Sequence, residues 1–342
     1  MSEFDASTHL SIIRNGNGNL THLISLPTTE ANPDAAPGDP VVSKDVTLNV
    51  ETNTWVRIYR PTKLPSNDNA IARLPIIIYF HHGGWILFSA SDSATHLNCS
   101  QIASEIPAIT VSVNYRLAPE SRLPAQYHDG IDAIRWVRKQ ALLDDPEGEQ
   151  WLRDYGDFSR CYLYGCGCGG NIAFFSALKA LELKLEPLKI AGIMMNQPMF
   201  GGMQRTKSEL RFATDQILPL TALDLMWDMV LPIGACRDHR YCNPMCDGAH
   251  KEMFSRLGRC LVIGFGGDPL IDRQQEFVTL LVTSGVQVDS RFDETGFHII
   301  DMVDPRRATA VLNVVKEFIL DFSRAGSSSS LDNKRLVKSN SS

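Results

Sequence analysis

The sequence is poor in the residues and segments that mark secreted, membrane-spanning and nucleic-acid-binding proteins. Only 8 of its 342 residues are Cys, far below the content of a disulfide scaffold, so a reduced intracellular protein is expected. No stretch reaches the roughly 18 apolar residues that a membrane span needs. The segment that begins at Met1 has neither the basic region nor the apolar region of a secretory signal.

A basic surface is also lacking. Lys and Arg together number 33 against 39 for Asp and Glu, which gives a formal net charge of −6 and argues against nucleic acid as a partner. Cys236, Cys242 and Cys246 form no C-x-x-C pair with a matching His spacing, so no metal site is expected, and no cofactor motif is found. We therefore expect a cytoplasmic protein, with the nucleus left open.

The sequence does contain an alternation of strand-like and helix-like segments. Continuous apolar runs, typical of buried parallel strands, are separated by longer helix-like stretches. The strand-like segments are residues 74–80, 109–115, 161–165, 190–196, 260–265 and, as an edge strand, 286–292; helix-like segments include 130–139 and 272–284. This order predicts an α/β fold, with a mostly parallel central sheet and helices on both faces. In such folds ligands bind at the carboxyl ends of the strands.

Two glycine-rich segments directly follow strand-like segments. Residues 81–85 read His-His-Gly-Gly-Trp, and their adjacent glycines indicate either an oxyanion hole or an ordinary tight turn. Residues 165–171 read Gly-Cys-Gly-Cys-Gly-Gly-Asn, at the strand-to-helix position of a nucleophile elbow. The G-x-S-x-G pattern of such an elbow has Ser where this chain has Gly167, so a plain glycine-rich turn remains the alternative.

Two titratable residues follow later strand-like segments. Asp268 lies just beyond the fifth segment, where it could orient an imidazole, whereas Asp272 could cap the following helix. His298 follows the edge strand, 30 residues after Asp268. A His in that place is a better candidate general base than an isolated surface His.

Jointly these segments resemble the plant carboxylesterase family of the α/β-hydrolase fold, in its hormone-sensitive-lipase-like group. The resemblance extends from about residue 40 to about residue 322. The motifs that carry it are His81…Gly83-Gly84-Trp85, Tyr115-Arg-Leu-Ala-Pro-Glu120, Tyr155-Gly-Asp-Phe-Ser159, Gly169-Gly-Asn171, Arg237-Asp-His239, Tyr241, Asn243-Pro244, Gly267-Asp-Pro-Leu-Ile-Asp272 and Gly296-Phe-His298.

This resemblance implies one α/β-hydrolase domain with a small helical lid. Residues 1–40 would form an N-terminal lid segment and loop, and residues 41–323 the hydrolase domain. A lid insertion is expected at about 203–245, and residues 324–342 would be a disordered tail.

The family's catalytic triad runs Ser, Asp, His along the chain, and the matching positions here are Gly167, Asp268 and His298. Gly167 is thus a degenerate nucleophile position in a site whose other parts are kept. The oxyanion donors implied are the backbone N–H groups of Gly83, Gly84 and Cys168. The resemblance also implies a pocket for a small hydrophobic substrate, in a protein that is a monomer or homodimer. The aromatic residues that would line this pocket, or alternatively belong to the core, are Trp85, Phe200, Trp227 and Phe297.

Two further details remain open from the residues alone. The alignment of Gly169-Gly-Asn171 with the family's S-x-G-G-N pattern places Gly167 at the apex, so Cys166 or Cys168 is a less favoured nucleophile. His82 stands where the family usually has Gly, and is either a second acid/base or a surface change. The unusual residues Cys168 and His82 near Gly167 favour natural divergence over an engineered inactivation.

Three classes of function are compatible with this resemblance. The first is a non-hydrolytic cyclase, lyase or isomerase of plant specialised metabolism, with an alkaloid as one candidate substrate. Such an enzyme would use a His–Asp pair and an oxyanion hole and would need no nucleophile. The second is a residual or Cys-based carboxylesterase that hydrolyses small-molecule esters. The third is a ligand-binding receptor or catalytically dead relative, as in the gibberellin receptor of the same fold; the retained His298 counts against it.

Overall fold

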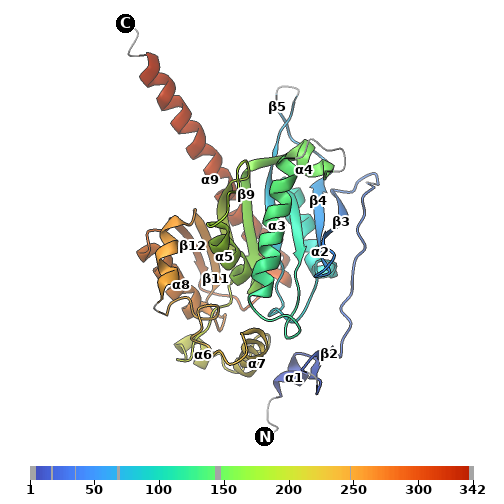
Figure 1. Ribbon diagram of the computed structural model, residues 1–342, viewed down its shortest axis with the longest axis vertical. Helices are drawn as coiled ribbons and strands as arrows, with labels where there is room; N and C mark the ends of the chain where they lie inside the picture. The colour runs from blue at the N-terminus through green and yellow to red at the C-terminus, as the bar shows by residue number, and fades with distance from the viewer. Residues whose placement is uncertain are drawn as a thin grey trace.

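The computed structural model describes residues 5–16, 18–34, 36–67, 70–142, 148–246 and 248–338. An eight-stranded sheet forms its centre, in the order β12-β11-β10-β9-β7-β8-β4-β3 (Figure 1). Its strands are β3 (Val41–Asn49), β4 (Thr54–Pro61), β7 (Leu74–Phe80), β8 (Ile109–Asn114), β9 (Gly156–Cys166), β10 (Ile190–Asn196), β11 (Cys260–Phe265) and β12 (Val288–Asp293).

The sheet is parallel from β8 to β12, and only β3 and β4 pair antiparallel to their neighbours. The predicted α/β fold with a mostly parallel sheet is confirmed. All seven residues of β7 are buried, as expected of a strand covered by helices on both faces. β12 lies at the edge of the sheet, where the sequence placed it.

Helices cover both faces of the sheet and enclose two separate cores. The helices are α2 (Ser93–Glu105), α3 (Ala125–Leu142), α4 (Gln150–Tyr155), α5 (Cys168–Ala180), α8 (Ile271–Thr283) and α9 (Pro305–Lys338). One core joins α3, α5 and α8 through residues such as Ile134, Phe174 and Phe277. The other joins α2 and α9 through Ile102 and Phe318.

Short elements gather at the end of the sheet where the parallel strands finish (Figure 1). They are α1 (Ala6–His9), β1 (Ile12–Arg14), β2 (Leu20–His22), α6 (Lys207–Arg211) and α7 (Leu220–Val230). α1 packs against α7, and Arg14 forms an ion pair of 3.1 Å with Asp228. The N-terminal segment and the insertion thus meet over one end of the sheet, while their role as a lid stays a prediction.

The remaining described elements lie outside these layers. They are the two-residue strands β5 (Ser66–Asn67) and β6 (Ala70–Ile71) and the 3₁₀-helices η1 (Ala249–Arg256) and η2 (Ile300–Met302). Helix α9 extends away from the domain (Figure 1). The tail predicted to be disordered, 324–342, falls on residues whose side chains are outside the described part of the chain, so that prediction is untested.

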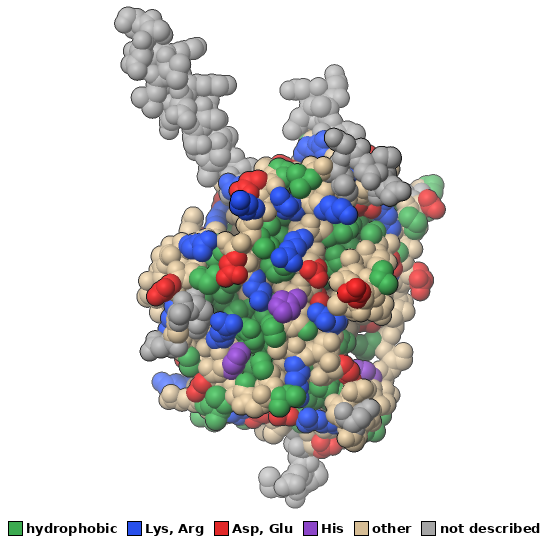
Figure 2. All heavy atoms as spheres, viewed as in Figure 1, with side chains coloured by type: hydrophobic (Ala, Val, Ile, Leu, Met, Phe, Trp, Pro, Cys, Tyr) green, Lys and Arg blue, Asp and Glu red, His purple; other side chains and the backbone are tan. Residues whose placement is uncertain are grey.

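The surface carries charges of both signs. On the face drawn in Figure 2, acidic side chains lie among the basic ones, in line with the small negative net charge. Within the described ranges, no helix combines the length and the apolar character required to cross a membrane.

Candidate active site

The site is built around Gly167, at the turn between β9 and α5. Its backbone angles, φ 56° and ψ −122°, lie in a region that favours glycine. The Gly167 N–H donates to the carbonyl of Asn196 at 2.9 Å, and its own carbonyl accepts from Met199 N at 3.1 Å, which anchors the turn to the neighbouring strand end. A Cβ added at Gly167 would lie 3.5 Å from Nε2 of His298. A side chain at this position would therefore face the imidazole directly.

The glycines after the turn bring α5 close to the sheet. A Cβ at Gly169 would collide with the carbonyl of Phe80, the last residue of β7. Only glycine therefore lets the first turn of α5 pack against the strand end that leads into residues 81–85. This contact places the two glycine-rich segments side by side, as the resemblance implied.

His298 and Asp268 form a buried pair at the ends of β12 and β11. The Nδ1 atom of His298 lies 2.9 Å from Oδ2 of Asp268. That carboxylate also accepts hydrogen bonds from Nε2 of Gln197 at 2.9 Å and Nε2 of Gln274 at 3.0 Å, while Leu270 N donates to Oδ1 at 2.9 Å. The carboxylate is thus fixed from several sides and holds the imidazole in one orientation.

The electrostatics of this pair suit a general base. Burial acts to lower the pKa of His298, but the charges of Asp268, Asp301 and Asp215 outweigh it and raise the pKa above its usual value. Because Nδ1–H donates to Asp268, the other ring nitrogen, Nε2, is left unprotonated in the neutral form. That nitrogen is the one that faces Gly167.

The segment after β7 has the backbone shape of an oxyanion loop. Gly83 and Gly84 have φ angles of 117° and 61°. A Cβ at Gly84 would press on Sδ of Met226 on α7, whose flexible side chain would have to shift, and the positive φ itself favours glycine. Trp85 N donates to Sγ of Cys168 at 3.3 Å, which ties this loop to the N-terminus of α5. The three predicted donors, Gly83, Gly84 and Cys168, are therefore neighbours.

The two cysteines beside Gly167 point away from the imidazole. Sγ of Cys168 lies 3.6 Å from the Tyr115 hydroxyl and 3.7 Å from the carbonyl of His81. Cys166 accepts a hydrogen bond from Asn196 at 3.7 Å on the other side of the sheet. Burial raises the pKa of Cys168 to about 11 and that of Cys166 to about 12. Both thiols are protonated at neutral pH and are poor nucleophiles.

The adjacent histidines have different surroundings. The ring of His81 stacks on Tyr115 with centroids 4.1 Å apart, and its Nδ1 lies 2.7 Å from the carbonyl of His82, so it acts structurally. His82 packs against Phe88 and has its Cβ 3.5 Å from the added Cβ of Gly167. Burial, followed by the charges of His81 and His298, lowers the pKa of His82 to about 3. His82 is therefore neutral near pH 7 and suited to hydrogen bonding rather than to proton donation as a cation.

A cavity of about 210 Å³ opens beside His298, and its lining differs from the sequence prediction. Its walls are aliphatic and thioether side chains with one aromatic ring: Leu10, Leu87, Phe88, Met199, Ile217, Leu218, Met226 and Ile299, beside His9, His82, Gly83, Gly84 and His298.

The four aromatics predicted to line the pocket lie elsewhere. Trp85 packs on Trp227 with centroids 4.7 Å apart, and Phe200 packs on Phe277 at 4.3 Å, all within the core. Phe297 is partly buried against the core on the α2 and α9 side. Large rings gain most from full burial, which leaves smaller and more flexible side chains at the cavity wall.

Within the described ranges, no three or more His, Cys, Asp or Glu side chains are grouped so that they could hold a metal ion. The chemistry that these residues support by themselves is proton transfer beside a stabilised oxyanion.

Comparison with known proteins agrees with this geometry. A family model of the α/β-hydrolase fold matches residues 77–302. The chain is 56% identical to a probable carboxylesterase of Arabidopsis thaliana over 316 residues, which cover 92% of this chain and 97% of that protein. The chain belongs to the plant carboxylesterase family. The family and the fold inferred from the sequence motifs are thereby confirmed.

Other relatives extend this picture of the plant carboxylesterases. A 3-O-acetylpapaveroxine carboxylesterase of Papaver somniferum is 46% identical over 283 residues, or 81% of this chain and 90% of that protein. A solved structure of a fungal esterase from Rhizomucor miehei superposes with a TM-score of 0.71 at 22% identity, covering 84% of this chain and 85% of the other. That likeness shows the shared fold.

Proposed function

We propose that this carboxylesterase-like protein is a non-hydrolytic enzyme of plant specialised metabolism, a cyclase, lyase or isomerase that uses His298 as general acid/base. The observation that carries the proposal is the space beside Nε2 of His298. A Cβ at Gly167 would face that nitrogen at 3.5 Å, yet the chain supplies no hydroxyl there, and both flanking thiols are directed elsewhere.

The proposed chemistry needs no covalent intermediate. Nε2 of His298 removes a proton from a carbon next to a substrate carbonyl, and the electron pair moves onto the carbonyl oxygen. The N–H groups of Gly83, Gly84 and Cys168 stabilise that oxyanion. As the electron pair returns, one of three steps follows. In a lyase the bond to a leaving group on the next carbon breaks, and the imidazolium of His298 protonates that group. In a cyclase the carbon adds to a double bond within the substrate, whose displaced electron pair takes the proton, and in an isomerase the proton returns to another carbon.

The cavity supports a small and mostly apolar substrate. Its walls combine Leu10, Leu218 and Ile217 with the thioethers of Met199 and Met226, and methionines adapt to irregular apolar shapes. Neutral His82 supplies a hydrogen-bonding group at the same wall. The substrate class that we propose is a small, mostly apolar carbonyl compound, and the reaction needs no cofactor.

Ester hydrolysis is the second candidate, and the similarity to named carboxylesterases favours it. Without a nucleophile, His298 would activate a water molecule for direct attack on the ester carbonyl. This route forms no acyl-enzyme. It should be slow, because loss of a triad Ser costs about a million-fold in kcat in a well-studied protease.

Base catalysis can be tested without knowledge of the natural substrate. The probe is 5-nitrobenzisoxazole, which opens in one step when a base removes its carbon-bound proton. We expect saturable turnover by the parent protein and a loss of roughly 10²- to 10⁴-fold in His298→Ala, the usual contribution of a positioned base. The matched control is His128→Ala, an exposed His on α3. Equal turnover by the parent and His298→Ala would contradict the proposal.

A further inference from the structure

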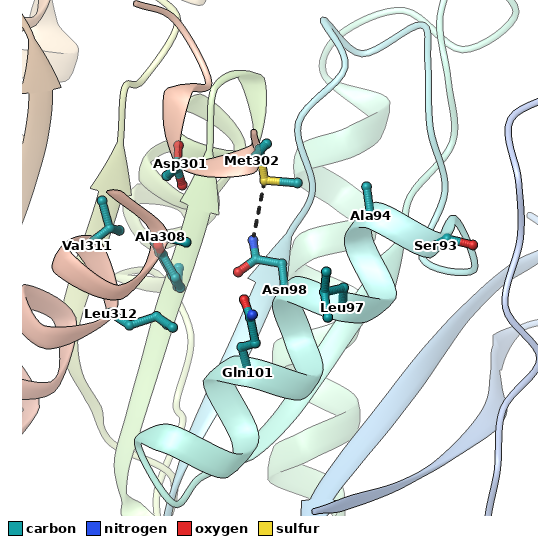
Figure 3. Close-up of a pocket in the computed structure, with 11 residues that line it drawn as sticks. Ser93, Ala94, Leu97, Asn98, Gln101, Asp301, Met302, Ala308, Val311 and Leu312 are labelled. Atoms are coloured by element: carbon teal, nitrogen blue, oxygen red, sulfur yellow. Dashed lines mark hydrogen bonds between the residues drawn. The ribbon is translucent and has the colours of Figure 1, made fainter. Parts of the chain in front are cut away.

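A second cavity of about 260 Å³ lies on the other side of the sheet, between α2 and the segment formed by η2 and α9. Figure 3 shows Asn98 and Gln101 of α2 on the side toward Met302 of η2 and Leu312 of α9, and Leu97 and Asp301 also line the cavity. Its lining shares no residue with that of the cavity beside Gly167. It is therefore a separate site, and binding there does not depend on the proposed function.

The unusual feature of this cavity is the carboxylate of Asp301. Its Oδ2 accepts a hydrogen bond from Nδ2 of Asn196 at 2.8 Å. Burial raises the pKa of Asp301, an effect that the hydrogen bond from Asn196 and the charge of His298 oppose. The residue is half-buried rather than sealed from water, and the lining of the cavity contains no Lys or Arg to pair with its carboxylate. Partial removal of a carboxylate from water favours its pairing with a cation supplied from outside.

Neutral hydrogen-bonding groups line the same cavity. Nδ2 of Asn98 donates to the Tyr79 hydroxyl at 2.9 Å and lies 3.9 Å from Sδ of Met302. Because the amide nitrogen is engaged in this way, the carbonyl oxygen of Asn98 is directed toward α9 (Figure 3). The side chain of Gln101 lies one turn further along the same face.

We propose that this cavity binds the ammonium group of a small organic amine. The carboxylate of Asp301 and the carbonyl oxygen of Asn98 would accept its N–H groups, and its apolar body would contact Leu97, Met302 and Leu312. A divalent metal ion does not fit, because Ca²⁺ and Mg²⁺ prefer about six or more oxygen ligands and the lining offers a single carboxylate among apolar walls. The volume lies below the roughly 300–1,000 Å³ of drug-sized sites, so the amine should be small.

Occupation of this site would be sensed by His298, three residues before Asp301. The charge of Asp301 is one of the causes that raise the pKa of His298. Tyr164 and Cys166 of β9 also sense Asp301, but burial raises their pKa values and keeps both neutral. A bound ammonium group opposes the charge of Asp301, and so lowers the pKa of His298. By reciprocity, protonation of His298 weakens amine binding to the same extent.

The test uses n-butylammonium as the probe and n-butanol as its uncharged counterpart. Binding is followed by the NMR signal of the Met302 methyl group in protein labelled at methionine, with the signal assigned by its loss in Met302→Leu. We expect a saturable shift with butylammonium and none with butanol at the same concentrations. Asp301→Asn should weaken binding at least tenfold, whereas Asp304→Asn, a matched change in the same loop outside the lining, should leave it unchanged.

A second variant keeps the test decisive if Asp301→Asn does not fold. Ala308→Phe fills the cavity with a ring from α9 and keeps the Asp301 carboxylate, so it should also abolish binding. Its circular dichroism should match that of the parent, which would show that the variant is folded. Equal shifts with butanol, absence of saturation, or binding that persists in Asp301→Asn and Ala308→Phe would each overturn the site. A pKa of His298 that stays constant while butylammonium saturates the cavity would overturn the coupling.

Discussion

At the scale of single residues, Gly167 has the backbone shape of a nucleophile elbow but no side chain that could act as a nucleophile. Its φ of 56° is costly for a side chain, so glycine avoids backbone strain at a position that carries no hydroxyl. The surrounding groups, His298 and its carboxylate partner, keep the geometry of a base directed at that point.

Restoring the hydroxyl should restore ester hydrolysis. Gly167→Ser is expected to turn over p-nitrophenyl butyrate at least about a hundredfold faster than the parent. The increase in kcat that a triad Ser gives in an evolved hydrolase is far larger than this. The measurement is the release of nitrophenol together with labelling by a fluorophosphonate. Gly167→Ala carries the same backbone strain without the hydroxyl and should show neither. A parent protein as active as Gly167→Ser would instead support hydrolysis by the second candidate route.

The two buried histidines of the oxyanion loop should make the fold sensitive to acid. Burial lowers the pKa of His81 to about 4 and that of His82 to about 3, while both regain a value near 6.5 in the unfolded chain. Below about pH 6.5 the unfolded state binds protons that the folded state does not, so stability falls as the pH falls. Each group contributes up to about 1.4 kcal/mol per pH unit.

Urea unfolding between pH 7 and pH 5 measures this effect. His82→Leu should reduce the slope of the unfolding free energy against pH by about 1 kcal/mol per unit, whereas the exposed His22→Leu should leave it unchanged. A slope that does not respond to His82→Leu would show that His82 takes up protons as readily in the folded protein as in the unfolded chain.

At the scale of elements, the site depends on how closely α5 approaches β7. Gly169→Ala should destabilise the protein by about 1–3 kcal/mol, the usual cost of overpacking, because its Cβ would collide with the carbonyl of Phe80. Gly258→Ala is the control, since its Cβ would meet only the carbonyl of Ile190 at 3.8 Å. Thermal unfolding of both variants measures the difference. Similar melting temperatures would show that the contact between α5 and β7 yields at little cost.

The parallel strands were predictable from the sequence because a strand covered on both faces must be apolar throughout. β7 and β11 are examples. β3 and β4 were missed, since β3 mixes exposed, half-buried and buried positions and carries Lys44 and Asp45, which obscures the pattern.

The pairing of His298 with Asp268 was predictable from their places beyond strand ends, yet Gln197 and Gln274, which hold Asp268, were not predicted. Gln197 directly follows β10, so its position at the end of a central strand was the signal that could have found it. The four aromatic residues predicted to line the pocket lie in or against the core instead. An apolar residue type does not show whether its side chain faces a cavity or the core. Trp85 and Trp227 illustrate this, since both are fully enclosed.

At the scale of the whole molecule, segments far apart in the chain close the cavity. His9 and Leu10 of the N-terminal segment line it together with Leu218 and Met226 of the insertion. Nε2 of His9 lies 3.2 Å from the carbonyl of Ile217, which links the two segments. Access to His298 therefore depends on a contact between the start of the chain and its middle.

Shortening Leu10 should loosen this closure without disturbing the sheet. Leu10→Ala is expected to raise the KM for 5-nitrobenzisoxazole several-fold while kcat changes little, because the wall of the cavity is lost but His298 is not moved. Leu142→Ala, at an exposed position of α3, is the matched control. Steady-state kinetics gives both constants. A fall in kcat with an unchanged KM would show instead that Leu10 supports the base.

The glycine at the turn also bears on how such a protein could arise. A serine codon of the AGC or AGT type becomes a glycine codon by one base change. Because the turn at Gly167 is held by backbone hydrogen bonds and by the neighbouring glycines, that change would not be blocked by misfolding. An ancestral hydrolase could therefore lose its nucleophile in a single step and persist as a folded protein, with its base and oxyanion donors open to selection for another reaction.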